Sequence, residues 1–161
     1  GRVRSRQIEN IIKEIEAIAK KGIKEVVITG IHVASYGIDF EEEIGLIDLL
    51  EQINKIDGIE RIRFVSPHPK DFTDDVIDAI ADSKKISRLL HVPLQSGSTE
   101  VLKVMNRKYT KEQYLQLIDR IKTKIPETVF STDIIVGFPG ETDEDFETTL
   151  NFVKDIKLSK I

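Results

Sequence analysis

The sequence predicts an α/β fold built on a parallel sheet. Four short runs rich in β-branched residues alternate with amphipathic segments of helical length. Strands that alternate with helices are joined by crossover connections, which make neighbouring strands parallel. Each apolar run also stops at glycine or proline, the residues that most often end strands. Two architectures fit this order equally well: a doubly wound open sheet and part of a β/α barrel.

The first half of the chain is expected to hold two strands. Ser5 is the expected cap of a first helix, because isoleucines follow it at helical spacing until Gly22. Prolines after the second strand push their predecessors out of helical space and end it. The expected elements after the first helix are a strand at 25–29, a helix at about 43–56, a strand at 61–65 and a helix at 71–81.

The second half repeats this alternation with clearer helix-start signals. Ser98, Thr110 and Thr142 each precede an amphipathic segment and are expected to cap it. Thr142 and Asp145 together resemble a capping box. The expected elements are a strand at 88–94, a helix after Ser98, a helix from Thr110 to about Lys124, a strand at 129–136 and a helix from Thr142.

Composition limits the function classes. The 161 residues fit one domain, and 40% hydrophobic with 32% charged residues is ordinary for a globular protein. The absence of cysteine excludes disulfides and thiolate metal sites from this chain. No run approaches a membrane span and no signal-peptide pattern is present, so we expect no membrane partner and a cytoplasmic location. The net charge of −4 gives no general attraction to nucleic acid, although two basic clusters occur, at Arg2, Arg4 and Arg6 and at Arg107, Lys108 and Lys111.

Polar and glycine residues follow all four expected strands. Because the carboxyl ends of parallel strands meet at one edge of a sheet or barrel, these exits predict a ligand site there. For any single exit an ordinary turn or helix cap is the better explanation, and only the four exits together favour a site. The exit residues considered are Thr29, Gly30, His32, Ser66, His68, Gln95, Ser96, Asp133, Val136 and Gly137.

Three kinds of site compete for the stretch STDIIVGFPGETDEDF at residues 131–146 and its neighbours. A phosphate cradle would use the glycines of GFPG at a helix start, but the Walker lysine is missing and acidic residues follow. A metal-dependent hydrolase would use His32, His68 and Asp133, but no HxH or HExxH spacing is present. A nucleoside or amino-acid-derived cofactor would lie across the strand ends and meet Gln95 and Ser96.

Long motifs resemble one family. The stretches GRVRSR (1–6), GIKEVVITGIHVASYG (22–37), RIRFVSPHPKDF (61–72), HVPLQSGSTEVLKVMNRKYT (91–110) and TDIIVGFPGETDEDFETTL (132–150) resemble, in family order, the radical S-adenosylmethionine (SAM) domain of tRNA methylthiotransferases. They cover nearly the whole chain.

This resemblance implies a barrel of six β/α units. A [4Fe-4S] cluster on a CxxxCxxC loop after the first strand would reduce SAM to a 5′-deoxyadenosyl radical. That radical would abstract hydrogen from an adenosine next to the tRNA anticodon, and a methylthio group would be installed. A second cluster in a separate domain would take part in sulfur supply.

The chain departs from this pattern because it has no cysteine. We therefore expect a single-domain fragment over residues 1–161 with about strands two to five: an open, partial (β/α)6 barrel whose first and last strands are missing. No cluster is expected in this chain, which alone would be inactive. SAM, [4Fe-4S] clusters and tRNA would belong to the parent protein, and exposed sheet edges would allow self-association of the fragment.

The resemblance also implies roles for single residues. Gly30 and His32 match the segment near the methionine end of SAM, and Ser66 would face the same cavity. Gln95 and Ser96 match the exit that resembles a ribose-contacting region, and their side-chain donors and acceptors suit hydroxyl groups.

On the same basis, Arg107 would bind the SAM carboxylate or be ordinary surface charge. Asp133 would face the barrel mouth, and Val136 and Gly137 would lie beside the adenine. Residues 2–6 would contribute arginines to tRNA phosphate binding.

The substrate stays open between two modified adenosines. The segments ITGIHVASYG and LSKI resemble the branch acting on threonylcarbamoyl-adenosine. The segments SPHPKDF and HVPLQSGST resemble the branch acting on isopentenyl-adenosine. A third branch, which modifies a ribosomal protein aspartate, ranks last, and a non-catalytic RNA-binding domain is the rival outside the radical enzymes.

Overall fold

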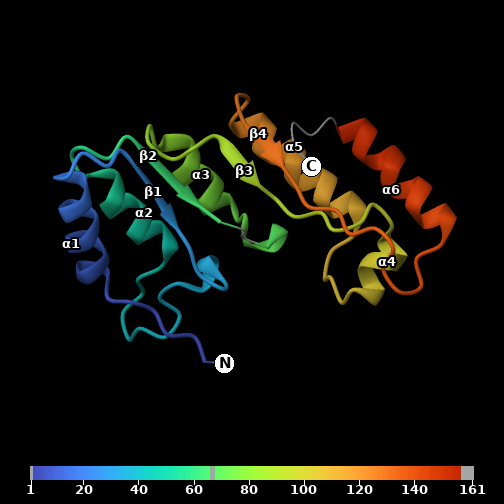
Figure 1. Cartoon of the computed structure of the whole chain (residues 1–161), viewed down its shortest axis with the longest axis horizontal. Coiled ribbons are helices and arrows are strands. Elements are labelled where there is room, and N and C mark those ends of the chain that lie inside the picture. Colours follow the sequence, from blue (N-terminus) through green and yellow to red (C-terminus); the bar gives the residue numbers. More distant parts are fainter. Residues whose placement is uncertain (1, 66–67, 157–161) are drawn as a thin grey trace. The chain divides into compact units, whose positions relative to one another are not determined.

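The computed structural model describes residues 2–65 and 68–156 (Figure 1). The chain forms two compact units, which are considered separately. Unit 1 comprises Gly1–Pro67 and Thr73–Ser87, and unit 2 comprises His68–Phe72 and Arg88–Ile161.

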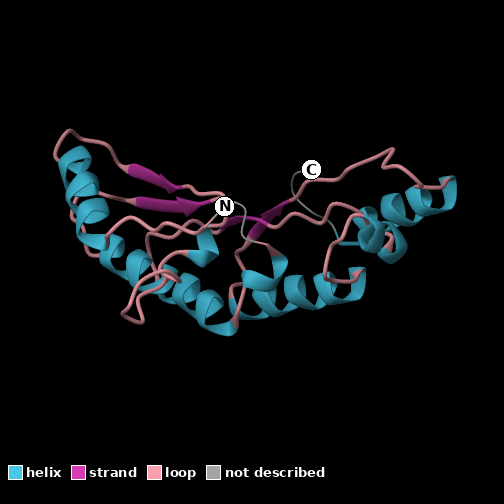
Figure 2. Ribbon diagram, turned by 90° about the horizontal axis from the view of Figure 1, so that it is seen from below, coloured by secondary structure: helices cyan, strands magenta, loops and turns pink. Residues whose placement is uncertain are grey.

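Unit 1 is a pair of parallel strands with helices on one face. Its elements are α1 (Ile8–Ala19), β1 (Glu25–Ile28), a 3-10 turn (Val33–Ser35), α2 (Leu46–Asn54), β2 (Arg61–Phe64) and α3 (Asp74–Asp82). Val26 of β1 lies opposite Ile62 of β2, and both side chains are buried. Figure 2 shows the helices of this unit on one side of the strand pair. The alternation of strand side chains therefore places one residue in two against the helices.

The other face of the β1–β2 pair is polar. The Glu25 carboxylate accepts hydrogen bonds from Arg61 Nη1 at 3.1 Å and Arg63 Nη1 at 3.4 Å. The hydrogen bond from Arg61 is the main cause that lowers the pKa of Glu25, with Arg63 contributing in the same direction. These pairs lie in water, so they orient side chains more than they stabilise the unit.

Unit 2 is a second parallel pair with three α-helices. Its elements are a 3-10 turn (Pro69–Asp71), β3 (Leu89–His91), α4 (Thr99–Val104), α5 (Lys111–Lys124), β4 (Val129–Ser131) and α6 (Asp143–Ile156). Leu90 and Phe130 are register partners and both are buried. Tyr114 of α5 is fully buried and donates its hydroxyl proton to the Val92 carbonyl at 2.8 Å, which fixes α5 beneath the strands.

The predicted α/β class and parallel pairing are confirmed. The pairs β1–β2 and β3–β4 follow chain order, and each sheet has two strands, so neither closes into a barrel. No helix within residues 2–65 and 68–156 has the length and apolar character needed to cross a membrane.

Local signals predicted three helix starts correctly and one wrongly. The hydroxyls of Ser98 and Thr110 accept from backbone N–H groups of α4 and α5, and Thr142 accepts from Asp145 N at 3.2 Å. The first helix instead begins at Ile8 after Gln7. Ser5 is not its cap, because its hydroxyl accepts from Gly37 N at 2.9 Å.

Other boundaries are shorter than expected. The helix expected from residue 71 begins at Asp74, capped by Thr73, after the 3-10 turn Pro69–Asp71. The strand expected at 88–94 ends at His91, before Pro93, which has no N–H to donate to a ladder. The strand expected at 129–136 ends at Ser131 and regains one parallel bridge, between Gln95 and Ile134.

Candidate functional site

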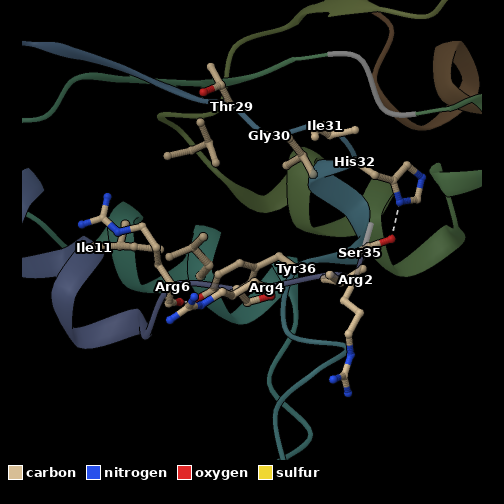
Figure 3. A pocket seen from close by; sticks show the side chains of 15 residues that line it. Arg2, Arg4, Arg6, Ile11, Thr29, Gly30, Ile31, His32, Ser35 and Tyr36 are labelled. Carbon is tan, nitrogen blue, oxygen red and sulfur yellow. Dashed lines mark hydrogen bonds between the residues drawn. The ribbon is translucent and has the colours of Figure 1, made fainter.

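Unit 1 contains a cavity at the carboxyl end of β1. Its volume is about 600 Å³. Figure 3 shows its lining, which comprises residues 2–6 and 28–33 with Ile11, Ser35, Tyr36 and Leu49. Two predicted site residues, Gly30 and His32, thus lie on the same cavity wall. The His32 ring is turned toward the Ser35 hydroxyl and hydrogen-bonds to it through Nδ1 (Figure 3).

The N-terminal segment is held against this cavity by hydrogen bonds from the loop after the 3-10 turn. Ser5 N donates to Asp39 Oδ2 at 2.9 Å, and the hydrogen bonds from Ser5 lower the pKa of Asp39. Tyr36 donates its hydroxyl proton to the Arg6 carbonyl at 2.8 Å. Burial, and then the Glu9 charge, raises the pKa of Tyr36, so this phenol stays a donor. These hydrogen bonds therefore fix the position of the N-terminal segment that carries the basic residues.

The cavity combines apolar side chains with a cationic rim. Arg6 Nη2 pairs with Glu14 Oε2 at 2.7 Å. Arg2 and Arg4 are exposed, and no carboxylate in the described part of the chain pairs with either. An apolar pocket with two unpaired guanidinium groups at its edge suits a ligand that has an apolar body and an anionic group.

In unit 2, backbone hydrogen bonds tie the two strand exits together. Gln95 N donates to the Asp133 carbonyl, and Ile135 N donates to the Gln95 carbonyl, both at 2.9 Å. Gln95 has φ +70°, a left-handed conformation that costs a non-glycine residue about 1–2 kcal/mol. Strain of this kind gathers at ligand-binding positions. Gln95 and Asp133 are thus brought together at one rim, as the sequence predicted.

A side-chain network lies on the same rim. His91 Nδ1 is 3.0 Å from Ser131 Oγ, and His91 Nε2 is 3.2 Å from Asp133 Oδ2. These three residues project from the sheet face opposite the buried Leu90 and Phe130, because side chains alternate along strands. The Asp133 side chain is 67% exposed, so a ligand can reach its carboxylate.

Ser96 takes a different place from the exposed rim. It is fully buried, and its hydroxyl contacts Thr149 Oγ1 at 3.2 Å and accepts from Ser98 N at 3.1 Å. Gly97 N also donates to Thr149 Oγ1, at 3.0 Å. The Ser96 hydroxyl therefore docks α6 against the strand exit, and a ligand would meet this residue through its backbone.

The glycine turn after β4 is closed by its own carboxylate. Gly137, at φ +76°, donates its N–H to Glu141 Oε2. Glu141 Oε1 is buried without a hydrogen bond from the described residues. A phosphate would have to displace this carboxylate, which argues against the phosphate cradle. Val136, the other predicted adenine neighbour, is 62% exposed.

The remaining predicted residues are less defined as a site. Arg107 follows α4 and is half-buried; burial raises the pKa of Tyr109 to about 12 while the Arg107 charge opposes that rise. Ser66 lies outside the described residues.

A metal centre finds no support among the described side chains. No group of three or more His, Asp or Glu side chains there could hold an ion. His32 contacts Ser35, and the His68 ring lies edge-on to Tyr109 at a centroid distance of 5.2 Å. His32 belongs to unit 1, whereas His68 and Asp133 belong to unit 2, so the structure does not present the three proposed ligands as one group. The same residues do not fit a [4Fe-4S] cluster, since the chain has no cysteine.

Sequence reasoning missed His91 as a member of the site. It treated this histidine as an interior strand residue, whereas the β3–β4 register places it opposite Ser131. The available signal was the polar i, i+2 pair Ser131 and Asp133, which must share a strand face. Glu141 was also missed, because it was considered only as a charge that repels phosphate.

Comparison with known proteins decides the family. The Radical SAM superfamily matches residues 1–153. The chain belongs to this superfamily. A tRNA-2-methylthio-N(6)-dimethylallyladenosine synthase from Fusobacterium nucleatum is 55% identical over 156 residues, covering 97% of this chain and 36% of that protein.

Other radical SAM relatives carry the same name. The protein from Clostridium botulinum (strain Loch Maree) is 54% identical over 98% of this chain and 35% of its own length. The protein from Lachnoclostridium phytofermentans is 53% identical over 97% of this chain and 34% of its own length. The chain thus spans about a third of the length of these curated relatives.

Proposed function

We propose that this chain is the SAM-binding part of a radical SAM enzyme that adds a methylthio group to N(6)-dimethylallyladenosine in tRNA. The observation that carries the proposal is the similarity to synthases named for that product, at 52–55% identity along nearly the whole chain. Their name favours the isopentenyl-type adenosine over the threonylcarbamoyl-type, between which sequence motifs left the choice open.

The strand exits of each unit support a role in holding SAM. In unit 1, Gly30 has no packing reason to be glycine: an added Cβ would meet only Val33, at the ordinary distance of 3.5 Å. The glycine leaves room for a ligand to approach the backbone closely at this position. In unit 2, Gln95 and Asp133 present an amide and a carboxylate at one rim, and such groups suit the hydroxyl and amino groups of a nucleoside.

In this proposal the chain binds SAM, and another part of the protein holds the cluster that reduces it. When bound, SAM supplies the carbon radical of this superfamily after one-electron reduction. This chain has no cysteine ligands for the reducing cluster. The role proposed for its residues is to bind and orient SAM and to exclude water. The cluster ligands are proposed to come from sequence beyond this chain.

Recognition of tRNA is proposed for the arginines at the edge of the unit 1 cavity. Arg2 and Arg4 are exposed and unpaired within the described residues, and guanidinium groups bind phosphate bidentately. Each phosphate contact of this kind would make the negative slope of log affinity against log salt steeper by about 0.7, the value for single strands. Self-association of this chain through its sheet edges remains a proposal beside tRNA binding.

The deciding experiment uses the complete gene that encodes this chain. We would express it in a bacterium that lacks tRNA methylthiolation, digest the tRNA to nucleosides and analyse them by mass spectrometry. The expected result is 2-methylthio-N(6)-dimethylallyladenosine. Appearance of methylthio-threonylcarbamoyl-adenosine instead would correct the substrate, and no methylthio product from well-expressed protein would overturn the proposal.

A matched variant connects that activity to this chain. Gly30→Ala in the complete protein should reduce product formation while the protein accumulates normally, since the new methyl group fits against Val33. A complete reading frame without a CxxxCxxC motif would favour the non-catalytic RNA-binding alternative.

A further inference from the structure

The network of His91, Ser131 and Asp133 has a defined hydrogen-bond direction. An ionised Asp133 carboxylate only accepts hydrogen bonds, so His91 Nε2, 3.2 Å from Oδ2, must carry a proton. In neutral His91 the other nitrogen, Nδ1, then accepts, and Ser131 Oγ, 3.0 Å away, donates. Asp133 therefore selects the ring tautomer, and the Ser131 hydroxyl, which can donate or accept, complements it.

This direction leaves one side of Asp133 available. His91 occupies Oδ2, while no hydrogen bond from the described residues reaches Oδ1. The Asp133 side chain is 67% exposed and that of His91 is 28% exposed, so the carboxylate is the more accessible of the two. A ligand with a hydroxyl or amino group has its more open approach at Asp133.

The backbone beneath the network is equally fixed. The Asp133 carbonyl accepts from Gln95 N at 2.9 Å, and Gln95 holds its left-handed conformation at that contact. With the backbone held by Gln95 and the carboxylate held by His91, the side chain of Asp133 has little rotational freedom left. Such restraint lowers the entropy lost when a ligand binds.

We propose that His91 is a positioning residue: it orients the Asp133 carboxylate toward the donor groups of the bound nucleoside cofactor, in the Nε2–H tautomer that Asp133 requires and Ser131 complements. The inference rests on the proposed function, because it takes Asp133 as a SAM contact. It adds a residue that acts only through Asp133 and touches no ligand.

The first test needs no ligand. Nitrogen-15 NMR of the His91 ring in the whole 161-residue chain, at a pH where the ring is neutral, should show the Nε2–H tautomer. Asp133→Asn should shift the ring toward a mixture of tautomers, whereas Ser131→Ala should leave the Nε2–H tautomer dominant. A dominant Nδ1–H tautomer in the unmodified chain would overturn the proposal.

The second test measures SAM binding by NMR titration. His91→Leu should weaken binding, because the Asp133 carboxylate is no longer held in the orientation that the ligand needs. His91→Gln keeps an N–H donor and should recover most of that loss. The double variant His91→Leu with Asp133→Asn should bind like Asp133→Asn alone, because coupled residues are not additive.

The outcomes separate this inference from the proposed function. If Asp133→Asn weakens binding but His91→Leu does not, or if their effects simply add, only the role of His91 is overturned. If the unmodified chain binds no SAM, or Asp133→Asn binds as well as it, the proposed SAM contact is overturned and the inference with it. Asp119→Asn, an exposed acid on α5, is the control and should bind normally.

Discussion

Substitution by alanine should affect the free energy of unfolding strongly at one strand-exit glycine and little at another. Gly97 lies against α6: an added Cβ would be 2.7 Å from Thr149 Cα and 3.1 Å from Phe152 Cβ. Carbon atoms pack at roughly 3.5–4.0 Å, so α6 would have to move by about 1 Å. Gly30 faces only Val33 Cγ2, at 3.5 Å, and has room for the same methyl group.

The magnitude for Gly97→Ala follows from three contributions. Overpacking by one methyl group costs about 1–3 kcal/mol. Moving α6 also weakens the hydrogen bond from Gly97 N to Thr149 Oγ1, which is 3.0 Å long, at a cost of about 0.5–1.5 kcal/mol. Lower entropy of the unfolded alanine chain returns about 0.4–1 kcal/mol. The free energy of unfolding should therefore fall by about 2 kcal/mol, which lowers Tm by about 4–8 °C.

Urea unfolding followed by circular dichroism measures the difference. Gly97→Ala should have a clearly lower midpoint, whereas Gly30→Ala should stay within about 0.5 kcal/mol of the unmodified chain. Gly30→Ala should nevertheless weaken SAM binding. The steric reasoning is refuted if Gly97→Ala is as stable as the unmodified chain, or if Gly30→Ala is the more damaging of the two.

Three further changes test other contacts. Burial raises the pKa of Tyr114 to about 12, so its contribution to stability is complete below the ordinary phenol pKa of about 10 and is lost as pH rises toward 12. Tyr114→Phe should therefore flatten the loss of stability at alkaline pH and should cost about 1 kcal/mol at neutral pH. Urea unfolding across pH measures both effects. The hydrogen bond from Ser98 is the main cause that lowers the pKa of Asp145. The contribution of Asp145 to stability is therefore complete above the ordinary carboxyl pKa and is lost as pH falls through the pKa of the folded protein. Asp145→Asn should flatten this loss of stability at acid pH in the same assay. Gln95→Gly should relieve the left-handed strain and raise the unfolding free energy by up to about 1 kcal/mol, while SAM titration shows weaker binding through loss of the side chain.

Controls for these changes come from the same elements. Asp155→Asn, an exposed acid on α6, should leave the acid decline of the unmodified chain in place. Gln95→Ala removes the side chain without relieving the backbone, so it should lose SAM affinity and gain no stability. An alkaline decline that is unchanged in Tyr114→Phe would show that another group causes it.

Local signals predicted most of the elements, and contacts distant in sequence explain most of the errors. Thr110 and Ser98 cap their helices because capping depends only on neighbours within three residues. Ser5 carries the same local signal, but a hydrogen bond from Gly37, distant in sequence, uses its hydroxyl. The sequence contains no local sign of that competition.

The candidate site likewise has a part that the sequence predicted and a part that depends on contacts distant in sequence. Within each unit, strand exits carry the predicted residues: Gly30 lines the unit 1 cavity, and Gln95 and Asp133 are hydrogen-bonded neighbours in unit 2. The pairing of His91 with Asp133 depends on the register between β3 and β4, and register could not be read from either strand alone.

The carboxylate that closes the glycine turn has a consequence for competition in solution. The Gly137 amide is already bonded to Glu141, so it offers no donor to free anions. Inorganic phosphate, pyrophosphate and the phosphate tails of nucleotides would each have to displace a tethered carboxylate. A tethered group has a high effective concentration at its site, which dissolved anions do not match. Dissolved phosphates should therefore bind poorly at the Gly137 amide. The proposed ligand SAM has no phosphate and would not compete with these anions at that position.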